Sequence, residues 1–280
     1  MNYIKTMLLM SGLVVMFGLI GNAIGGRQGM IMALGFAVAM NFFSYWFSDK
    51  MVLSSYGAKP IAKNQAPELY DAVRRLSKKA GLPMPKVYII NEQMPNAFAT
   101  GRNPDNAVVA VTAGLMKMLN QNELEAVLAH ELSHVKHRDI LTATIAATAA
   151  GAITVLATIG RWAMIFGGGR GDNAGLSDLL MLILAPIAAV LVQMMISRNM
   201  EYHADRKAAA ITGRPQDLIS ALERIHAGVK EGVRKRVPTH ASPSNQHMLI
   251  ASPFLGGMLG GLFSTHPSLE QRRAALRKLM

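Results

Sequence analysis

The sequence predicts a mixed α+β fold: a mainly helical integral membrane protein with four transmembrane helices and a polar domain that contains a small β-sheet. Hydrophobic residues make up 51% of the 280 residues and charged residues only 16%, whereas a soluble domain carries about 25% charged residues. Four apolar segments are long enough to cross the ~30 Å hydrocarbon core of a bilayer. The polar stretches between them show both helical and strand patterns.

The first two apolar segments cover residues 6–24 and 30–47, and only the run Gly-Gly-Arg-Gln-Gly separates them. So short a connection predicts a helical hairpin. The first segment is long for a signal peptide and no A-x-A cleavage site follows it, so we expect an uncleaved anchor. Tyr45 and Trp46 stand where an interfacial aromatic belt would lie.

The third and fourth apolar segments cover residues 140–159 and 179–196. The third carries no charged residue, and the fourth contains Pro186, which membrane helices tolerate. We expect both segments to span the bilayer. The alternative is that they are buried core helices, because segments rich in alanine and threonine are less decisive than segments rich in leucine.

Lysines and arginines follow the second and fourth apolar segments, whereas the loops inside the two predicted hairpins carry few of them. This asymmetry places both termini and the polar segments in the cytoplasm. The net charge of +12 fits contact with anionic lipid. No basic patch interleaved with aromatic residues and no helix-turn-helix pattern indicates a nucleic-acid partner.

The apolar segments divide the chain into four parts. Residues 1–50 are the first predicted transmembrane hairpin and residues 140–197 the second. Residues 51–139 and 198–280 are two halves of one polar domain.

The first half of the polar domain begins with an amphipathic helix pattern over residues 67–80. Three stretches have strand patterns: residues 86–90, 96–100 and 107–112. A second helix is predicted over residues 121–139, where Asn120 and Glu123 have the spacing of a capping box.

The run His130-Glu131-Leu132-Ser133-His134 lies in this second helix. Histidines four residues apart share one helix face, and their rings can reach one zinc ion, which prefers nitrogen ligands in a tetrahedral shell. Glu131 lies about 100° around the helix, where it can act as general base on a water without ligating the metal. The alternative, two exposed histidines on a charged helix, fits poorly with the otherwise apolar face on which Glu131 lies.

A third protein ligand must be histidine, aspartate or glutamate, because the chain has no cysteine. His137 follows His134 by three residues, but its ring is directed along the helix axis. Glu201 is the stronger candidate, because Asp205 follows one helical turn later and can accept the free N–H of a ligand histidine. The alternative is that Glu201 lies on a solvated helix face.

Four segments together resemble the HtpX family of membrane-bound zinc metalloproteases, which is related to the CAAX prenyl proteases. They are residues 96–101, 130–139, 197–205 and 263–268. The resemblance implies a zincin-like metalloprotease domain with one Zn²⁺ per chain, Glu201 as third ligand beside His130 and His134, and a role in stress response and membrane-protein quality control. Most relatives have arginine or alanine where this chain has Asn199 and His203, which flank the ligand without removing it.

We therefore expect a zinc metalloendopeptidase, a hydrolase of proteins and peptides, in the cell inner membrane with its catalytic domain facing the cytoplasm. Glu131 is the expected general base. His266 is the candidate donor to the developing oxyanion, or else a structural turn histidine. Residues 96–100 are expected at a sheet edge, where they would pair with an extended substrate. A homo-oligomer, or an assembly with other membrane quality-control proteases, stays open.

Two other functions are compatible with the same motif. An intramembrane-cleaving metalloprotease is disfavoured because charged residues surround the motif, and such a helix belongs outside the hydrocarbon. A non-catalytic membrane scaffold with a zinc site would have lost an essential residue, and none is missing. The stretch 241–261 is rich first in serine and proline and then in glycine, and we expect a lid there.

Overall fold

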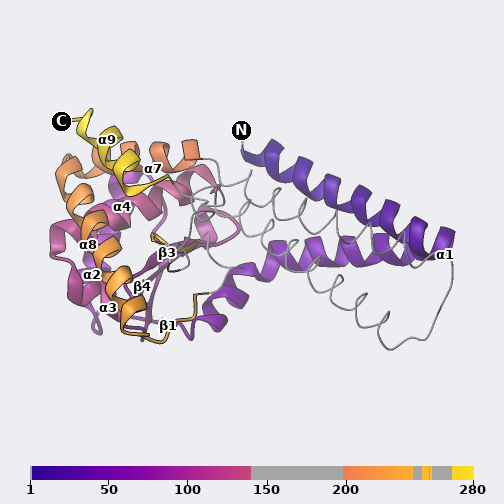
Figure 1. The fold of residues 1–280 in the computed structure, drawn as a ribbon, viewed down its shortest axis with the longest axis horizontal. Helices are drawn as coiled ribbons and strands as arrows, with labels where there is room; N and C mark the ends of the chain where they lie inside the picture. The colour runs from indigo at the N-terminus through magenta and orange to yellow at the C-terminus, as the bar shows by residue number, and fades with distance from the viewer. Residues whose placement is uncertain (1, 140–197, 242–247, 252, 254–266) are drawn as a thin grey trace. The chain divides into compact units, whose positions relative to one another are not determined.

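The computed structural model describes residues 2–139, 198–241, 248–251, 253 and 267–280 (Figure 1). The predicted third and fourth spans, and His266, lie outside the described residues. The chain divides into two compact units, of which one contains residues 2–46 and the other contains residues 47–139 and the described residues from 198 onward. The two halves of the predicted polar domain thus contribute to one unit.

The first unit is a helical hairpin. Helix α1 (Asn2–Ser55) reverses its direction at Gly26, whose φ of +57° lies in the left-handed region. The two limbs then run back along each other: the Asn41 side-chain amide donates to the Met10 carbonyl at 3.3 Å, and the rings of Phe17 and Phe36 lie 5.7 Å apart. This reversal is the one that the short glycine-rich connection predicts.

Among the described residues, Gly26–Phe47 is the helix that is long and apolar enough to cross a membrane. The first limb, expected to span over residues 6–24, contains a shorter apolar stretch, Met10–Leu19.

The second unit is built on a four-stranded sheet of order β1-β2-β4-β3. Its strands are β1 (Lys59–Pro60), β2 (Lys86–Ile90), β3 (Ala97–Thr100) and β4 (Val108–Thr112). Strands β2 and β4 are parallel, whereas β3 pairs antiparallel with β4 at the edge of the sheet. The three predicted strands are present to within one residue. Strand β1 was not predicted, because two residues are too short to show a strand pattern.

Six described helices belong to the second unit in addition to the last residues of α1, 47–55. They are α2 (Pro67–Ala80), α3 (Ala113–Met118), α4 (Gln121–His137), α7 (Arg198–Thr212), α8 (Pro215–Arg234) and α9 (Leu269–Arg277), and a short 3₁₀ turn, η1, covers Pro104–Asn106. Helix α4 begins with the predicted capping box of Asn120 and Glu123. It ends at His137 rather than Asp139, because Arg138 adopts a left-handed conformation with φ of +58°.

Helix α4 is the centre of the packing. It contacts α2, α7, α8 and strand β3, and its Leu128 and Leu132 are fully buried. The opposite walls of this core include Val109 of β4 and Leu222 of α8. Because packing surrounds α4, the side chains of its middle turns are held in fixed positions.

Candidate metal centre

Three side chains from two helices converge at one point. The Nε2 atoms of His130 and His134 on α4 lie 3.2 Å apart. Glu201 on α7 completes the group, with Oε1 at 3.3 Å from His134 Nε2 and Oε2 at 3.5 Å from His130 Nε2. All three ligand atoms lie within 4.8 Å of one another.

These spacings fit one metal ion. Two nitrogens bound to zinc at roughly 2.0–2.1 Å in a tetrahedral shell lie about 3.3 Å apart, and the observed distances scatter closely around that value. The site is also dry, because His130 is 5% exposed and Glu201 is 2% exposed. Two imidazoles and a carboxylate in such surroundings are a donor set that zinc accepts.

Carboxylates fix the orientation of both imidazoles. His130 Nδ1 lies 2.9 Å from Asp205 Oδ1, and His134 Nδ1 lies 3.2 Å from Asp139 Oδ2. An Nδ1–H that donates to a carboxylate leaves Nε2 with its lone pair for a metal. Asp205 was expected in this role. Asp139 was not, although its position five residues after His134 was a signal in the sequence.

A buried arginine from the C-terminal helix joins this network. Arg272 on α9 is 1% exposed, and it binds Asp205 through two nitrogens, one of them Nε at 2.9 Å from Oδ2. Its Nη1 lies 3.4 Å from Glu201 Oε2. Arg272 was not among the residues predicted from the sequence. Its spacing of four residues from Leu276, behind the capping residue Ser268, places both on the buried helix face and was the available signal.

The pKa values of the two histidines depend on the carboxylates around them. Burial alone lowers the pKa of each histidine, but hydrogen bonds to Asp205 and Glu201 outweigh it and raise the pKa of His130. Those to Asp139 and Glu201 raise the pKa of His134 well above its usual range. Without a metal, these carboxylates therefore favour the protonated form of both histidines.

Glu131 lies between the histidines and the edge strand. Its side chain is 7% exposed, and Oε2 accepts a hydrogen bond from the Ala99 N–H of β3 at 3.1 Å. Burial raises the pKa of Glu131, while charged His130 and His134 act in the opposite direction. A carboxylate beside a metal position can accept a proton and return it.

Comparison with known proteins places this site in a family. The model of peptidase family M48 matches residues 63–280. This chain belongs to peptidase family M48. It is 54% identical over 280 residues to a protein described as "Protease HtpX homolog" from Desulfatibacillum aliphaticivorans, covering 98% of this chain and 89% of that one. A second protein of that description, from Burkholderia ambifaria, is 51% identical and covers 99% and 97%.

The resemblance to the HtpX family is thereby confirmed, and the chain is a metallopeptidase. Among solved structures, Ste24p of S. mikatae shares the fold with a TM-score of 0.56 and 18% sequence identity, over 98% of this chain and 64% of that one. At this identity the likeness concerns the fold alone.

Two histidines near the motif of this M48 chain lie outside the group of three. The ring of His137 packs against that of His203, with centroids 4.6 Å apart. Among the described residues the group that could hold a metal is His130, His134 and Glu201, so His137 does not provide the third ligand. His266 falls outside the described part of the chain, and its role as oxyanion donor stays a prediction.

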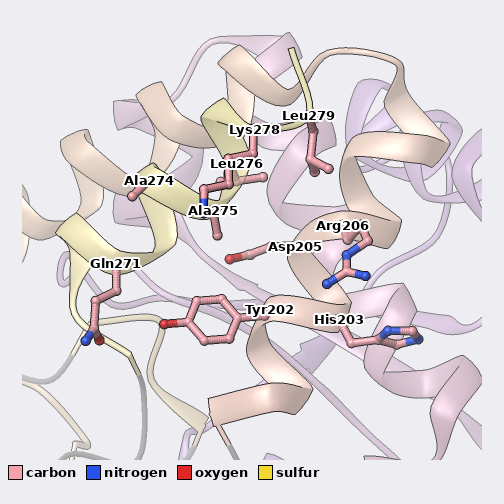
Figure 2. A pocket seen from close by; sticks show the side chains of 10 residues that line it. All are labelled: Tyr202, His203, Asp205, Arg206, Gln271, Ala274, Ala275, Leu276, Lys278 and Leu279. Carbon is pink, nitrogen blue, oxygen red and sulfur yellow. The ribbon is translucent and has the colours of Figure 1, made fainter.

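A cavity of about 780 Å³ lies between α7 and α9 (Figure 2). Tyr202, Asp205 and Arg206 line it from α7, and Gln271 and Ala274 line it from α9, with Lys278 just beyond the end of that helix. Asp205 reaches this cavity, whereas the three ligands do not line it. The cavity therefore borders the network behind the metal position and is not the cleft in which a substrate would meet the ligands.

Proposed function

We propose that this chain is a membrane-anchored zinc endopeptidase in which His130, His134 and Glu201 hold one Zn²⁺ and Glu131 is the general base. The observation that carries this proposal is the convergence of two buried ligand side chains and one half-buried one beside the buried carboxylate of Glu131. Three protein ligands leave one position open, as catalytic zinc sites require. Zinc held by such a set supplies Lewis-acid polarisation of the scissile carbonyl and acidifies water.

The chain's own residues then move the proton. Glu131 accepts a proton from the attacking water on one carboxylate oxygen and returns it to the leaving amine. The hydrogen bond from Ala99 N–H holds the other oxygen in place. Asp205 and Asp139 keep Nδ1 of the two histidines protonated, so that Nε2 stays available to the metal.

The edge strand β3 supports the choice of an extended peptide as substrate. Among the described residues it pairs with β4 alone. Edge strands recruit extended peptides through main-chain hydrogen bonds. At its beginning, the Asn96 side chain already binds the Met248 carbonyl and the Ile250 N–H, both at 3.1 Å. Pairing with a substrate is therefore assigned to residues 97–100, and because main-chain contacts dominate, sequence preference should be weak.

The membrane location rests on the first unit. Residues 26–47 form an apolar helix of sufficient length, and large apolar side chains along both limbs are exposed, among them Leu8, Leu19, Ile31 and Phe42. Exposed apolar surface of this extent is unfavourable in water and favourable in lipid. The Lys/Arg asymmetry places the catalytic unit in the cytoplasm, at the inner membrane, where proteins to be removed in quality control are the assigned substrates.

The intramembrane alternative is disfavoured by the end of α4. The helix stops at the left-handed Arg138, and Lys136 in its last turn is exposed. Charged residues at that point belong at the membrane surface or in water. The scaffold alternative is disfavoured because every residue that the proposed chemistry needs is present in the group.

The test is the Glu131→Gln variant of the full-length protein, purified in detergent. We expect one equivalent of zinc and no cleavage of casein, because the variant keeps the ligands and loses only the base. The control is Glu125→Gln on the same helix, which keeps both activity and metal. Peptide hydrolysis by a zinc-loaded Glu131→Gln protein would exclude Glu131 as the base.

A further inference from the structure

A second hollow, of about 430 Å³, lies where α2, α4 and α7 meet. Lys79 lines it from α2, Lys136 and His137 from α4, and Lys207 from α7. Most of its remaining wall is apolar, and no carboxylate stands among the described residues that line it. Lysine side chains from three helices thus line the same hollow.

Several other cations of the same unit have a carboxylate partner. Lys63 is paired with Asp71, Arg75 with Glu125 and Arg224 with Glu123. In the part of the chain that the structure describes, none of Lys79, Lys136 and Lys207 has such an ion pair. Cations that converge without counter-charge repel one another, and an anion between them offsets the repulsion.

One of the three ammonium groups is held in place. Lys136 Nζ donates to the Ala80 carbonyl at 2.6 Å. Because Ala80 is the last residue of α2, this bond keeps the Lys136 charge next to Lys79. The hollow therefore has one ammonium group held by a hydrogen bond, and the side chains of Lys79 and Lys207 also line it.

The hollow lies close along the chain to two apolar segments. His137 precedes the apolar segment 140–159 by three residues, and α7 begins two residues after the apolar segment 179–196. Three residues reach at most about 10 Å, so His137 lies at headgroup depth if that segment enters a bilayer. This step rests on the membrane location proposed above.

We infer that this hollow binds the phosphate of an anionic lipid headgroup, held by Lys79, Lys136 and Lys207. Basic pockets at the cytoplasmic membrane surface bind such headgroups, and the apolar wall formed by residues such as Ile211 suits the first atoms of the acyl chains. The lipid joins α4 to α7. These helices carry the three metal ligands, so the bound lipid braces the pair of helices on which the metal centre is built.

The test measures lipid binding to the full-length protein in detergent by native mass spectrometry. The probes are dioctanoyl phosphatidylglycerol, dioctanoyl phosphatidylcholine and glycerol 3-phosphate. We expect the anionic lipid to bind, the zwitterionic lipid not to bind, and glycerol 3-phosphate to bind far more weakly because it has no acyl chain. The readout needs no peptidase activity, so it stands whether or not the proposed catalytic roles hold.

The variant is Lys79→Gln/Lys207→Gln, which leaves the bond from Lys136 to Ala80 intact. Each lysine near an anionic lipid surface strengthens binding about five-fold, so the loss of both should raise the dissociation constant for phosphatidylglycerol roughly thirty-fold. The matched control, Lys117→Gln/Lys230→Gln, removes the same charge from exposed lysines outside the hollow and should bind as the wild type does. Lys79→Arg/Lys207→Arg, which keeps the charge, should also bind.

Three outcomes would overturn the inference. One is unchanged binding of phosphatidylglycerol by the Lys79→Gln/Lys207→Gln variant, and another is an equal loss in the control variant, which would mean diffuse attraction by net charge. The third is binding of glycerol 3-phosphate as tight as that of the lipid, which would make the ligand a free phosphate compound. Loss of binding in the arginine variant together with loss of zinc would indicate misfolding. The single variant Lys207→Gln then tests the inference in a folded protein, and it should bind phosphatidylglycerol about five-fold more weakly than the wild type.

Discussion

At the scale of single residues, the metal centre depends on a buried arginine far from the ligands in sequence. Arg272 neutralises Asp205, which in turn orients His130. Burial raises the pKa of Asp205, but Arg272 and His130 outweigh it and hold that pKa below its usual range. The charges of Arg272, Asp205 and His130 therefore form a buried ion-pair network, and removal of one of them leaves the other charges buried and unpaired.

We predict that Arg272→Gln destabilises the protein by about 3–5 kcal/mol, the usual effect of breaking a buried ion pair. Zinc affinity should fall 10- to 100-fold, as for other groups that orient a ligand. Chemical unfolding and zinc titration measure the two effects. The neighbour Arg273, whose pairs with Glu223 and Glu270 lie at the surface, is the control, and Arg273→Gln should change stability by less than about 1 kcal/mol. Equal behaviour of the two variants would contradict the role of Arg272.

Zinc binding should strengthen as pH rises. In the metal-free protein the pKa values of His130 and His134 lie above their usual value, about 6.5, and zinc must displace those protons. The protonated histidines stabilise the metal-free fold fully below about pH 6.5, and this stabilisation is lost as pH rises through the raised pKa values. Titration against a competing chelator should show proton release and an affinity that rises above pH 6.5; an affinity independent of pH from 6 to 8 would contradict it.

At the scale of elements, the sequence predicted those helices and strands whose formation depends on residues close together along the chain. The strands follow from short runs of strand-forming residues bounded by turn formers, α2 from helical periodicity, and the start of α4 from a capping box. All of these signals lie within a few residues. The end of α4 at Arg138 was not predictable, because a left-handed arginine has no local signature and depends on its surroundings. The burial of α9 was missed for the same reason, since its partners lie far away in sequence.

The capping box gives a prediction at this scale. The Asn120 side chain accepts from the Glu123 N–H at 3.0 Å, which satisfies one of the free donors at the beginning of α4. Asn120→Ala should lower the free energy of unfolding by about 1 kcal/mol, with zinc content unchanged. Gln121→Ala, at the exposed next position, should be nearly neutral. A loss of the same size in both variants would contradict a specific role of the Asn120 cap.

At the scale of the whole molecule, the sequence predicts the protein's family and motif residues better than it predicts buried contacts between distant segments. His130, Glu131 and His134 were visible because helical spacing alone brings them to one place. Glu201 could be argued from its neighbour Asp205 and from resemblance. Arg272 could not, because its contacts with Asp205 span 67 residues and no pattern within a single sequence reports a contact over that distance. The lysine hollow is likewise a product of three helices that only the fold brings together.

The measurement that tests the central claim most directly is the zinc content of Glu201→Gln, purified as the full-length protein. If Glu201 is the third ligand, this variant should retain little zinc and no peptidase activity, because two histidines alone bind the metal weakly. Asp205→Asn should show an intermediate loss of affinity of 10- to 100-fold, and Glu223→Gln on the surface of α8 should keep one equivalent. A full equivalent of zinc in Glu201→Gln, with the affinity of the wild type, would contradict the assignment of this metal centre.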